Sequence, residues 1–241
     1  MSADAVFFGA HPDDVELTSG GLAALLAGRG RRVVIVDLTR GEAASRGSPA
    51  ERAVEAAEAA RILGVAEREN LGLPDLGLDR HRREQLESVV ACLRRHRPAL
   101  VVAPDRHDEH PDHVEGSHLV AAACYLSGLV RHPAPGERHR PARLLFALYR
   151  GLERPHAVVD VSGAWERRMQ ALRAHASQLD PARGAATYLT HPDFLSAVEA
   201  RGRDLGAAIG ARYGEGYRAR GAVAIGDPVA LLPGTPAETR A

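Results

Sequence analysis

Short apolar runs alternate with segments of helical periodicity along the first half of the chain. The runs are rich in β-branched residues and are bounded by glycine, proline or charged residues, as in buried strands of a parallel sheet. Between them, apolar residues recur every three to four positions, which is typical of helices that pack on a sheet. We therefore predict strands at 5–10, 32–39, 65–71 and 100–104, and helices at 21–26, 49–63, 84–96 and 114–124.

The second half of the chain continues with shorter elements: predicted strands at 144–149 and 157–161 and predicted helices at 162–175 and 194–212. Strands that alternate with helices indicate an α/β protein, with a Rossmann-like, doubly wound, mostly parallel sheet and a smaller C-terminal portion. We expect residues 1–230 to form a single domain. Residues 231–241 are rich in proline, alanine and threonine and are predicted to be a disordered tail.

Composition narrows the class of protein. With 241 residues, of which 45% are apolar and 26% charged, the chain can bury a core as one globular unit. Its 31 basic and 31 acidic residues leave no net charge, which argues against nucleic acid or an anionic membrane as a partner. The chain has neither a run of about eighteen apolar residues nor a secretory signal pattern, so we expect a cytoplasmic protein.

The cysteines and most of the histidines are predicted to have structural or surface roles. Cys92 and Cys124 both lie in apolar helical patterns, which argues against a disulfide framework and against a thiolate metal site; we predict buried free thiols. A metal ion would then be bound through histidine and carboxylate. Of the 12 histidines, we place several at the surface: His81, His96, His132, His139 and His175.

A polar cluster follows the first predicted strand directly. Pro12 cannot continue the strand, so the residues after it form a loop at the carboxyl end of the strand, where ligands bind in open α/β sheets. His11 and Asp14 are three positions apart and could share one cation, while the adjacent Asp13 must point elsewhere and is free to act as a base. A solvated turn is the alternative, because proline and aspartate are common turn residues.

A second cluster follows the predicted strand at 100–104. Residues 105–113 contain three imidazoles and four carboxylates in nine positions. If the two strands are neighbours, the two loops converge and can supply two imidazoles and a carboxylate to a tetrahedral zinc ion, with a fourth position left for water. This pattern predicts a hydrolytic metal site.

Together, residues 10–16 and 110–113 resemble the paired motif of the LmbE-like or PIG-L family of zinc-dependent N-acetylglucosaminyl deacetylases. The resemblance covers roughly residues 4–220 and implies an LmbE-like fold. Further segments are similar to the bacillithiol-biosynthesis branch, which removes the acetyl group from N-acetylglucosaminyl malate: residues 39–42, 51–52, 165–178 and 212–217.

The resemblance implies a role for each motif residue. It implies that His11, Asp14 and His113 bind zinc and that Asp13 is the general base. It also implies that His110, oriented by Asp112, faces the acyl oxygen. A protonated His110, kept charged by Asp112, would stabilise the oxyanion formed by attack on the amide. Whether His110 or Asp13 protonates the leaving amine stays open.

Arg52 is a candidate substrate-binding residue, because a guanidinium at a helix start can donate two hydrogen bonds to a carboxylate or acyl oxygen. The alternative is an exposed arginine on an alanine-rich helix. The C-terminal portion offers further candidates for a sugar pocket: Tyr188, His191, Arg201 and Tyr213. The family resemblance also suggests a homo-oligomer, possibly a hexamer.

The predicted reaction is zinc-dependent removal of the acetyl group from an N-acetylglucosamine conjugate, with N-acetylglucosaminyl malate as the first choice of substrate. An inositol conjugate or a chito-oligosaccharide is the alternative substrate. The predicted metal ligands by themselves are also compatible with a metal-dependent phosphoesterase or with a catalytically silent metal-binding protein. A nucleotide-binding Rossmann protein is disfavoured, since carboxylates stand where the glycine-rich phosphate loop would be needed.

Overall fold

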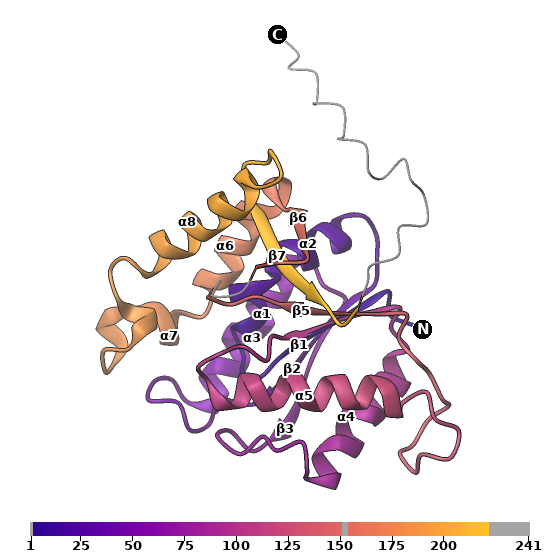
Figure 1. Ribbon diagram of the computed structural model, residues 1–241. Helices are drawn as coiled ribbons and strands as arrows, with labels where there is room; N and C mark the ends of the chain where they lie inside the picture. The colour runs from indigo at the N-terminus through magenta and orange to yellow at the C-terminus, as the bar shows by residue number, and fades with distance from the viewer. Residues whose placement is uncertain (1, 151–153, 222–241) are drawn as a thin grey trace.

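The computed structural model describes residues 2–150 and 154–221, which form one central sheet flanked by helices (Figure 1). The strands are β1 (Ala5–Gly9), β2 (Val33–Thr39), β3 (Glu67–Leu73), β4 (Leu100–Pro104), β5 (Arg143–Ala147), β6 (Ala157–Asp160) and β7 (Gly214–Ala219). The α-helices are α1 (Asp14–Thr18), α2 (Gly20–Gly28), α3 (Pro49–Leu63), α4 (Arg83–His96), α5 (Pro111–Leu126), α6 (Trp165–Arg173), α7 (Ala176–Leu179) and α8 (Phe194–Ala207). Three 3-10 turns complete the set: η1 (Ser162–Ala164), η2 (Pro181–Arg183) and η3 (Tyr188–Thr190).

The sheet has the strand order β3-β2-β1-β4-β5-β7-β6. The pairs from β3 through β5 are all parallel, whereas β7 runs antiparallel to both β5 and β6. This arrangement confirms the predicted α/β class and the mostly parallel, Rossmann-like sheet. No helix in the described ranges combines the length and the apolar character that crossing a membrane requires.

Both faces of the sheet are buried, which explains why its central strands read as continuous apolar runs. In β1, Val6 and Phe8 belong to the core under α4 and α5, whereas Ala5 and Phe7 belong to the core under α2, α3 and α6 (Figure 1). Successive side chains of a strand point to opposite faces, so a strand covered on both sides needs apolar residues at every position.

The strand order places the two polar clusters together. β1 pairs with β4 in parallel, so the carboxyl ends of both strands meet at the same edge of the sheet. After β1 the chain enters α1 and α2 on one face, and after β4 it enters α5 on the other. Such a switch point is where ligands bind in doubly wound sheets. Gly9 permits the sharp exit from β1, since a Cβ there would lie 2.9 Å from the carbonyl oxygen of His11.

The structure differs from the predicted elements at the end of the described chain. The last long helix ends at Ala207 instead of residue 212, and the following segment forms β7, which no prediction included. Two glycines and Glu215 interrupt the apolar pattern of β7, so its sequence does not read as a strand. The helix predicted from residue 114 begins three residues earlier, at Pro111. The predicted tail at 231–241 lies outside the described residues.

Candidate metal and active site

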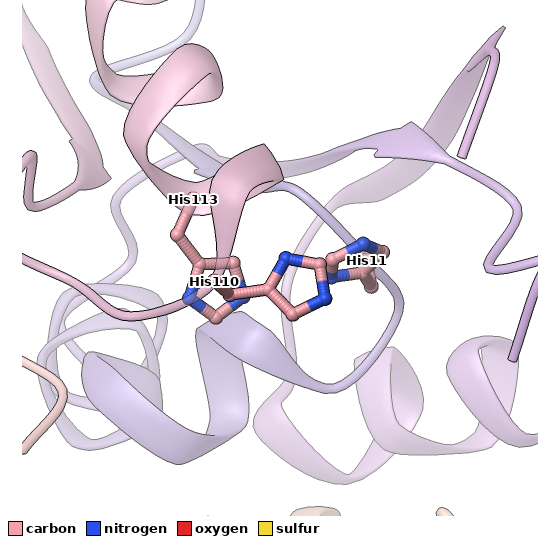
Figure 2. A group of neighbouring side chains, drawn as sticks. All are labelled: His11, His110 and His113. Carbon is pink, nitrogen blue, oxygen red and sulfur yellow. The ribbon is translucent and has the colours of Figure 1, made fainter. Parts of the chain in front are cut away.

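Three imidazoles meet at the carboxyl ends of β1 and β4 (Figure 2). His11 lies in the turn between β1 and α1, His110 is the N-cap residue of α5, and His113 lies in the first turn of α5. The ring centroids are 4.7 Å apart for His11 and His110, 4.9 Å for His110 and His113, and 5.5 Å for His11 and His113. The two loops therefore converge, as the sequence predicts for neighbouring strands.

The Asp14 carboxylate lies between two of these rings. Its Oδ2 is 3.5 Å from Nδ1 of His11, and its Oδ1 is 3.2 Å from Nε2 of His113. Burial alone would lower the pKa of the His113 imidazole, but the neighbouring carboxylates of Asp14 and Asp108 outweigh it and raise that pKa to about 10. His11, Asp14 and His113 are all buried, so their donor atoms form a compact pocket that could hold a cation in place of the protons.

The far nitrogen of each of the two rings is held by another carboxylate. Nδ1 of His113 lies 3.0 Å from Oδ2 of Asp108, and Nε2 of His11 lies 3.3 Å from Oδ2 of Asp112. A carboxylate on the outer nitrogen is the usual support for a metal-binding histidine, because it fixes the ring orientation and the tautomer. The inner nitrogens of both rings then face Asp14.

These donors fit a divalent metal ion. Two imidazole nitrogens and one carboxylate are ligands of the kind that bind zinc at catalytic sites, where a fourth position stays open. Ring nitrogens of His11, His110 and His113 also lie within 4.8 Å of one another, so His110 is a second possibility for the third ligand besides Asp14. Asp14 is the better choice, because its negative charge offsets a dication and its oxygens already face both rings.

Asp13 has a separate environment from Asp14. Its backbone φ of 116° is strained for a residue with a side chain, and its carboxylate pairs with Arg52. Its Oδ2 lies 3.6 Å from Nη2 of Arg52. Burial raises the pKa of the Asp13 carboxyl, while the Arg52 guanidinium opposes this change. A buried carboxylate of raised pKa at the edge of a metal pocket is suited to proton transfer.

Arg52 is buried at the site, so the alternative prediction, that it is an exposed arginine on a helix, is wrong. Its side chain donates to the carbonyl oxygens of Pro12 at 2.6 Å and Gly41 at 3.2 Å. Gly41 has a φ of 66°, and a Cβ there would lie only 1.8 Å from Nη1 of Arg52. The guanidinium thus braces the first loop and Asp13, and it also lines the cleft in front of them.

Asp112 contacts different groups from those predicted. Its carboxylate accepts hydrogen bonds from the backbone N–H groups of Leu76 and Leu78, and it lies beside His11 instead of orienting the ring of His110. Its own backbone N–H donates to Nδ1 of His110 at 3.2 Å. Burial, together with the nearby rings of His11 and His113, lowers the pKa of His110. The structure therefore favours a neutral His110, where the sequence predicted a protonated one.

Asp75 is a site residue that the sequence analysis missed. It follows β3, and its Oδ1 lies 3.1 Å from Nε2 of His11. The available signal was its position after a third parallel strand, but β3 has a weak apolar pattern and is half-exposed. His175 was also misplaced: it is fully buried, beside Glu16 and not at the surface.

A cleft of about 480 Å³ opens in front of the imidazoles and of Asp13, within the usual size range of small-molecule pockets. Tyr149, Arg150 and Tyr188 line it from the C-terminal half of the chain. Tyr188 was a predicted pocket residue. Tyr213 was another, but its ring stacks on Trp165 at a centroid distance of 4.2 Å and belongs to the core.

Comparison with known proteins agrees with this geometry. Residues 6–124 match the PIG-L family, described as GlcNAc-PI de-N-acetylase. A 1D-myo-inositol 2-acetamido-2-deoxy-alpha-D-glucopyranoside deacetylase of Saccharomonospora viridis is 31% identical over 227 residues, covering 72% of this chain and 84% of that protein. The family match spans both polar clusters.

Solved structures share the fold over most of its length. A conserved protein of Thermus thermophilus has a TM-score of 0.85 and 38% identity, covering 92% of this chain and 97% of that one. An N,N'-diacetylchitobiose deacetylase from Pyrococcus horikoshii has a TM-score of 0.78 and 26% identity, covering 90% of this chain and 84% of that one.

The Saccharomonospora viridis enzyme is named for an inositol conjugate and the Pyrococcus horikoshii enzyme for diacetylchitobiose, so neither supports the predicted placement in the bacillithiol branch. The Pyrococcus horikoshii structure shares the fold, and the family match at residues 6–124 contains both polar clusters. The chain belongs to the PIG-L family of LmbE-like deacetylases.

Proposed function

We propose that this protein is a zinc-dependent de-N-acetylase that hydrolyses the acetamide of an N-acetylglucosamine conjugate. The observation that carries the proposal is that two adjacent carboxylates have different partners: Asp14 contacts two imidazoles, while Asp13 lies beside Arg52 and lines the same cleft. Hydrolysis of an amide needs this combination of a cation site and a separate base. Membership of a deacetylase family supports the same reaction.

In this proposal His11, Asp14 and His113 hold the zinc ion. When bound, zinc supplies a Lewis acid and lowers the pKa of a water molecule to about 7. Asp13 accepts the proton of the water that attacks the acetamide carbonyl. Its position beside Arg52 keeps the carboxylate oriented toward the cleft edge.

His110 stabilises the developing oxyanion as a neutral donor. Its Nδ1 accepts the backbone N–H of Asp112, so the ring proton is on Nε2 in the neutral tautomer. Such a donor typically contributes about a hundred- to a thousandfold in rate. Because burial raises the pKa of Asp13 and lowers that of His110, Asp13 is the better carrier of the proton that the leaving amine needs.

For the substrate, the relatives favour an inositol conjugate or diacetylchitobiose over N-acetylglucosaminyl malate. The rings of Tyr149 and Tyr188, which line the cleft, suit packing against the apolar face of a sugar. Arg150 lies over the Tyr188 ring at 4.1 Å and adds donors for hydroxyl groups.

The test is a substrate panel. Purified, zinc-loaded protein is incubated with the N-acetylglucosamine conjugates of inositol and malate and with diacetylchitobiose, and acetate release is measured with and without a chelator. We expect acetate from at least one conjugate, loss of activity with the chelator, and recovery with added zinc. Release of phosphate from a phosphoester, with no acetate from any conjugate, would replace the proposal by the phosphoesterase alternative.

A further inference from the structure

A second group of metal-binding side chains lies between β3 and α4, and it shares no residue with the active site. Glu69 comes from the edge strand β3, and Cys92 and His96 come from the last two turns of α4. One donor atom from each of the three residues lies within 4.8 Å of the other two. Contrary to the surface position predicted for His96, only 3% of this residue is exposed, and Cys92 is fully buried.

The spacing of the group explains why the side chains converge. Cys92 and His96 are four positions apart on α4, so they lie on the same face of the helix. That face packs toward β3, where the Glu69 carboxylate meets both side chains. The distances from its Oε1 are 3.0 Å to Sγ of Cys92 and 3.2 Å to Nε2 of His96.

These distances are close to those of a metal site. With bond lengths of about 2.0 to 2.3 Å, the ligand atoms of a tetrahedral zinc ion are about 3.3 to 3.8 Å apart. A displacement of a few tenths of an ångström would therefore admit a cation between the three donors. One sulfur, one nitrogen and one oxygen form a ligand set for a thiophilic dication, unlike the sulfur-free set of the active site.

Arg95 occupies the outer side of Glu69. Its Nη2 lies 2.7 Å and 2.6 Å from the two carboxylate oxygens, and its side chain is 53% exposed. An exposed arginine can swing into solvent at little cost, because surface ion pairs contribute about 1 kcal/mol or less. Its departure would free both carboxylate oxygens of Glu69 for a cation.

We propose that Glu69, Cys92 and His96 form a second cation site, which binds zinc or another thiophilic divalent ion and ties the edge strand β3 to the end of α4. On binding, the thiol of Cys92 loses its proton to solvent and the thiolate forms the bond to the metal. Arg95 is the counterion of Glu69 that the incoming dication replaces. This site is independent of the deacetylase reaction.

The experiment is a titration of metal-free, full-length protein with Co²⁺. Thiolate bound to cobalt gives a charge-transfer band in the near ultraviolet, which a site of imidazoles and carboxylates cannot give. We expect this band to grow with one equivalent of cobalt per chain and to be displaced by zinc. The active-site variant His113→Ala should retain the band, which separates this proposal from the proposed function.

Cys92→Ser should lose the band and one equivalent of bound metal while keeping its deacetylase activity. Cys124→Ser is the matched control, since Cys124 is the other buried free thiol, and it should retain the band. Arg95→Ala alters an exposed side chain and should tighten cobalt binding, because it removes the competing cation. No band in the wild-type protein, a band that persists in Cys92→Ser, or weaker binding by Arg95→Ala would each overturn the proposal.

Discussion

At the scale of single residues, two adjacent aspartates have different chemistry because their backbones differ. Asp14 begins α1 with its carboxylate between His11 and His113. Asp13 has a positive φ and pairs with Arg52. A non-glycine residue in this conformation costs about 1 to 3 kcal/mol, a strain that is typical of functional sites. This strained backbone conformation gives Asp13, the proposed base, a different partner from Asp14, the proposed metal ligand.

Asp13→Asn tests this separation. The amide cannot accept the proton of water, so we expect kcat to fall by about a hundred- to ten-thousandfold while the zinc content stays at one ion in the active site. Zinc content and acetate release are measured on the same preparation. Loss of the metal together with the activity would show that Asp13 is a ligand.

A pair of histidine variants distinguishes the two possible donor sets. His113→Ala removes a ligand in both sets and should empty the active site of metal. His110→Ala should keep the metal and lose about a hundred- to a thousandfold in kcat, because it removes only the oxyanion donor. Metal analysis by mass spectrometry checks both variants. If His110→Ala loses the metal, the third ligand is His110 and not Asp14.

At the scale of elements, the start of α2 depends on a residue almost two hundred positions away. Its N-cap residue, Ser19, makes no side-chain hydrogen bond to the first turn. Instead, the Glu215 carboxylate of β7 accepts the N–H groups of Gly21 at 2.7 Å and of Leu22 at 2.8 Å. A carboxylate at a helix N-terminus satisfies free donors and complements the helix dipole. β7 thereby holds the helix that follows the metal loop.

Glu215→Gln should lower the free energy of unfolding by about 3 kcal/mol, because it weakens these bonds and leaves the buried guanidinium of Arg168 without its ion pair. Urea unfolding measures the change. Glu166→Gln, at an exposed position of α6, is the control and should change the stability by less than about 1 kcal/mol. Equal effects of the two variants would contradict the capping role of Glu215.

At the scale of the whole molecule, a buried ion-pair cluster connects β3, β2 and α1 behind the active site. Arg68 of β3 donates to Glu16 at 2.5 Å and to Asp37 at 2.8 Å. Burial alone would raise the pKa of Glu16, but Arg68 and His175 lower it to about 2. The cluster holds the helix of the metal loop against the sheet edge.

Arg68→Met should destabilise the protein by about 3 to 5 kcal/mol at neutral pH, because it leaves two buried carboxylates without their counterion. Arg61→Met is the matched control: Arg61 pairs with Glu58 at the surface, and its loss should cost less than about 1 kcal/mol. Both free energies come from urea unfolding. A small effect of Arg68→Met would mean that the carboxyl groups of Glu16 and Asp37 can be protonated or hydrated without loss of folding free energy.

The expectations of a homo-oligomer, possibly a hexamer, of a single domain over residues 1–230 and of a cytoplasmic location stay predictions. Light scattering on the purified protein measures the first of them.

Local patterns in the sequence determined most of the parallel sheet and the position of the site along the chain. The apolar runs of β1, β2 and β4 need no distant partner to be recognised, because burial on both faces makes most of their positions apolar. The polar clusters that follow β1 and β4 stand out for the same reason. The residue types in these clusters and the short spacings between them are enough to predict their chemistry.

Only the tertiary structure decided which groups touch across the fold. The carboxylate of Asp112 contacts His11, 101 positions away, whereas only its backbone N–H reaches His110, which is two positions away. Glu215 caps a helix 194 positions earlier. It lies in β7, whose glycines interrupt the apolar pattern, so the sequence did not predict this strand. Such contacts follow from strand order and helix placement, which local periodicity does not encode. Distant pairs are fixed by packing of the whole chain, whereas a helix or a strand is fixed by its own few residues.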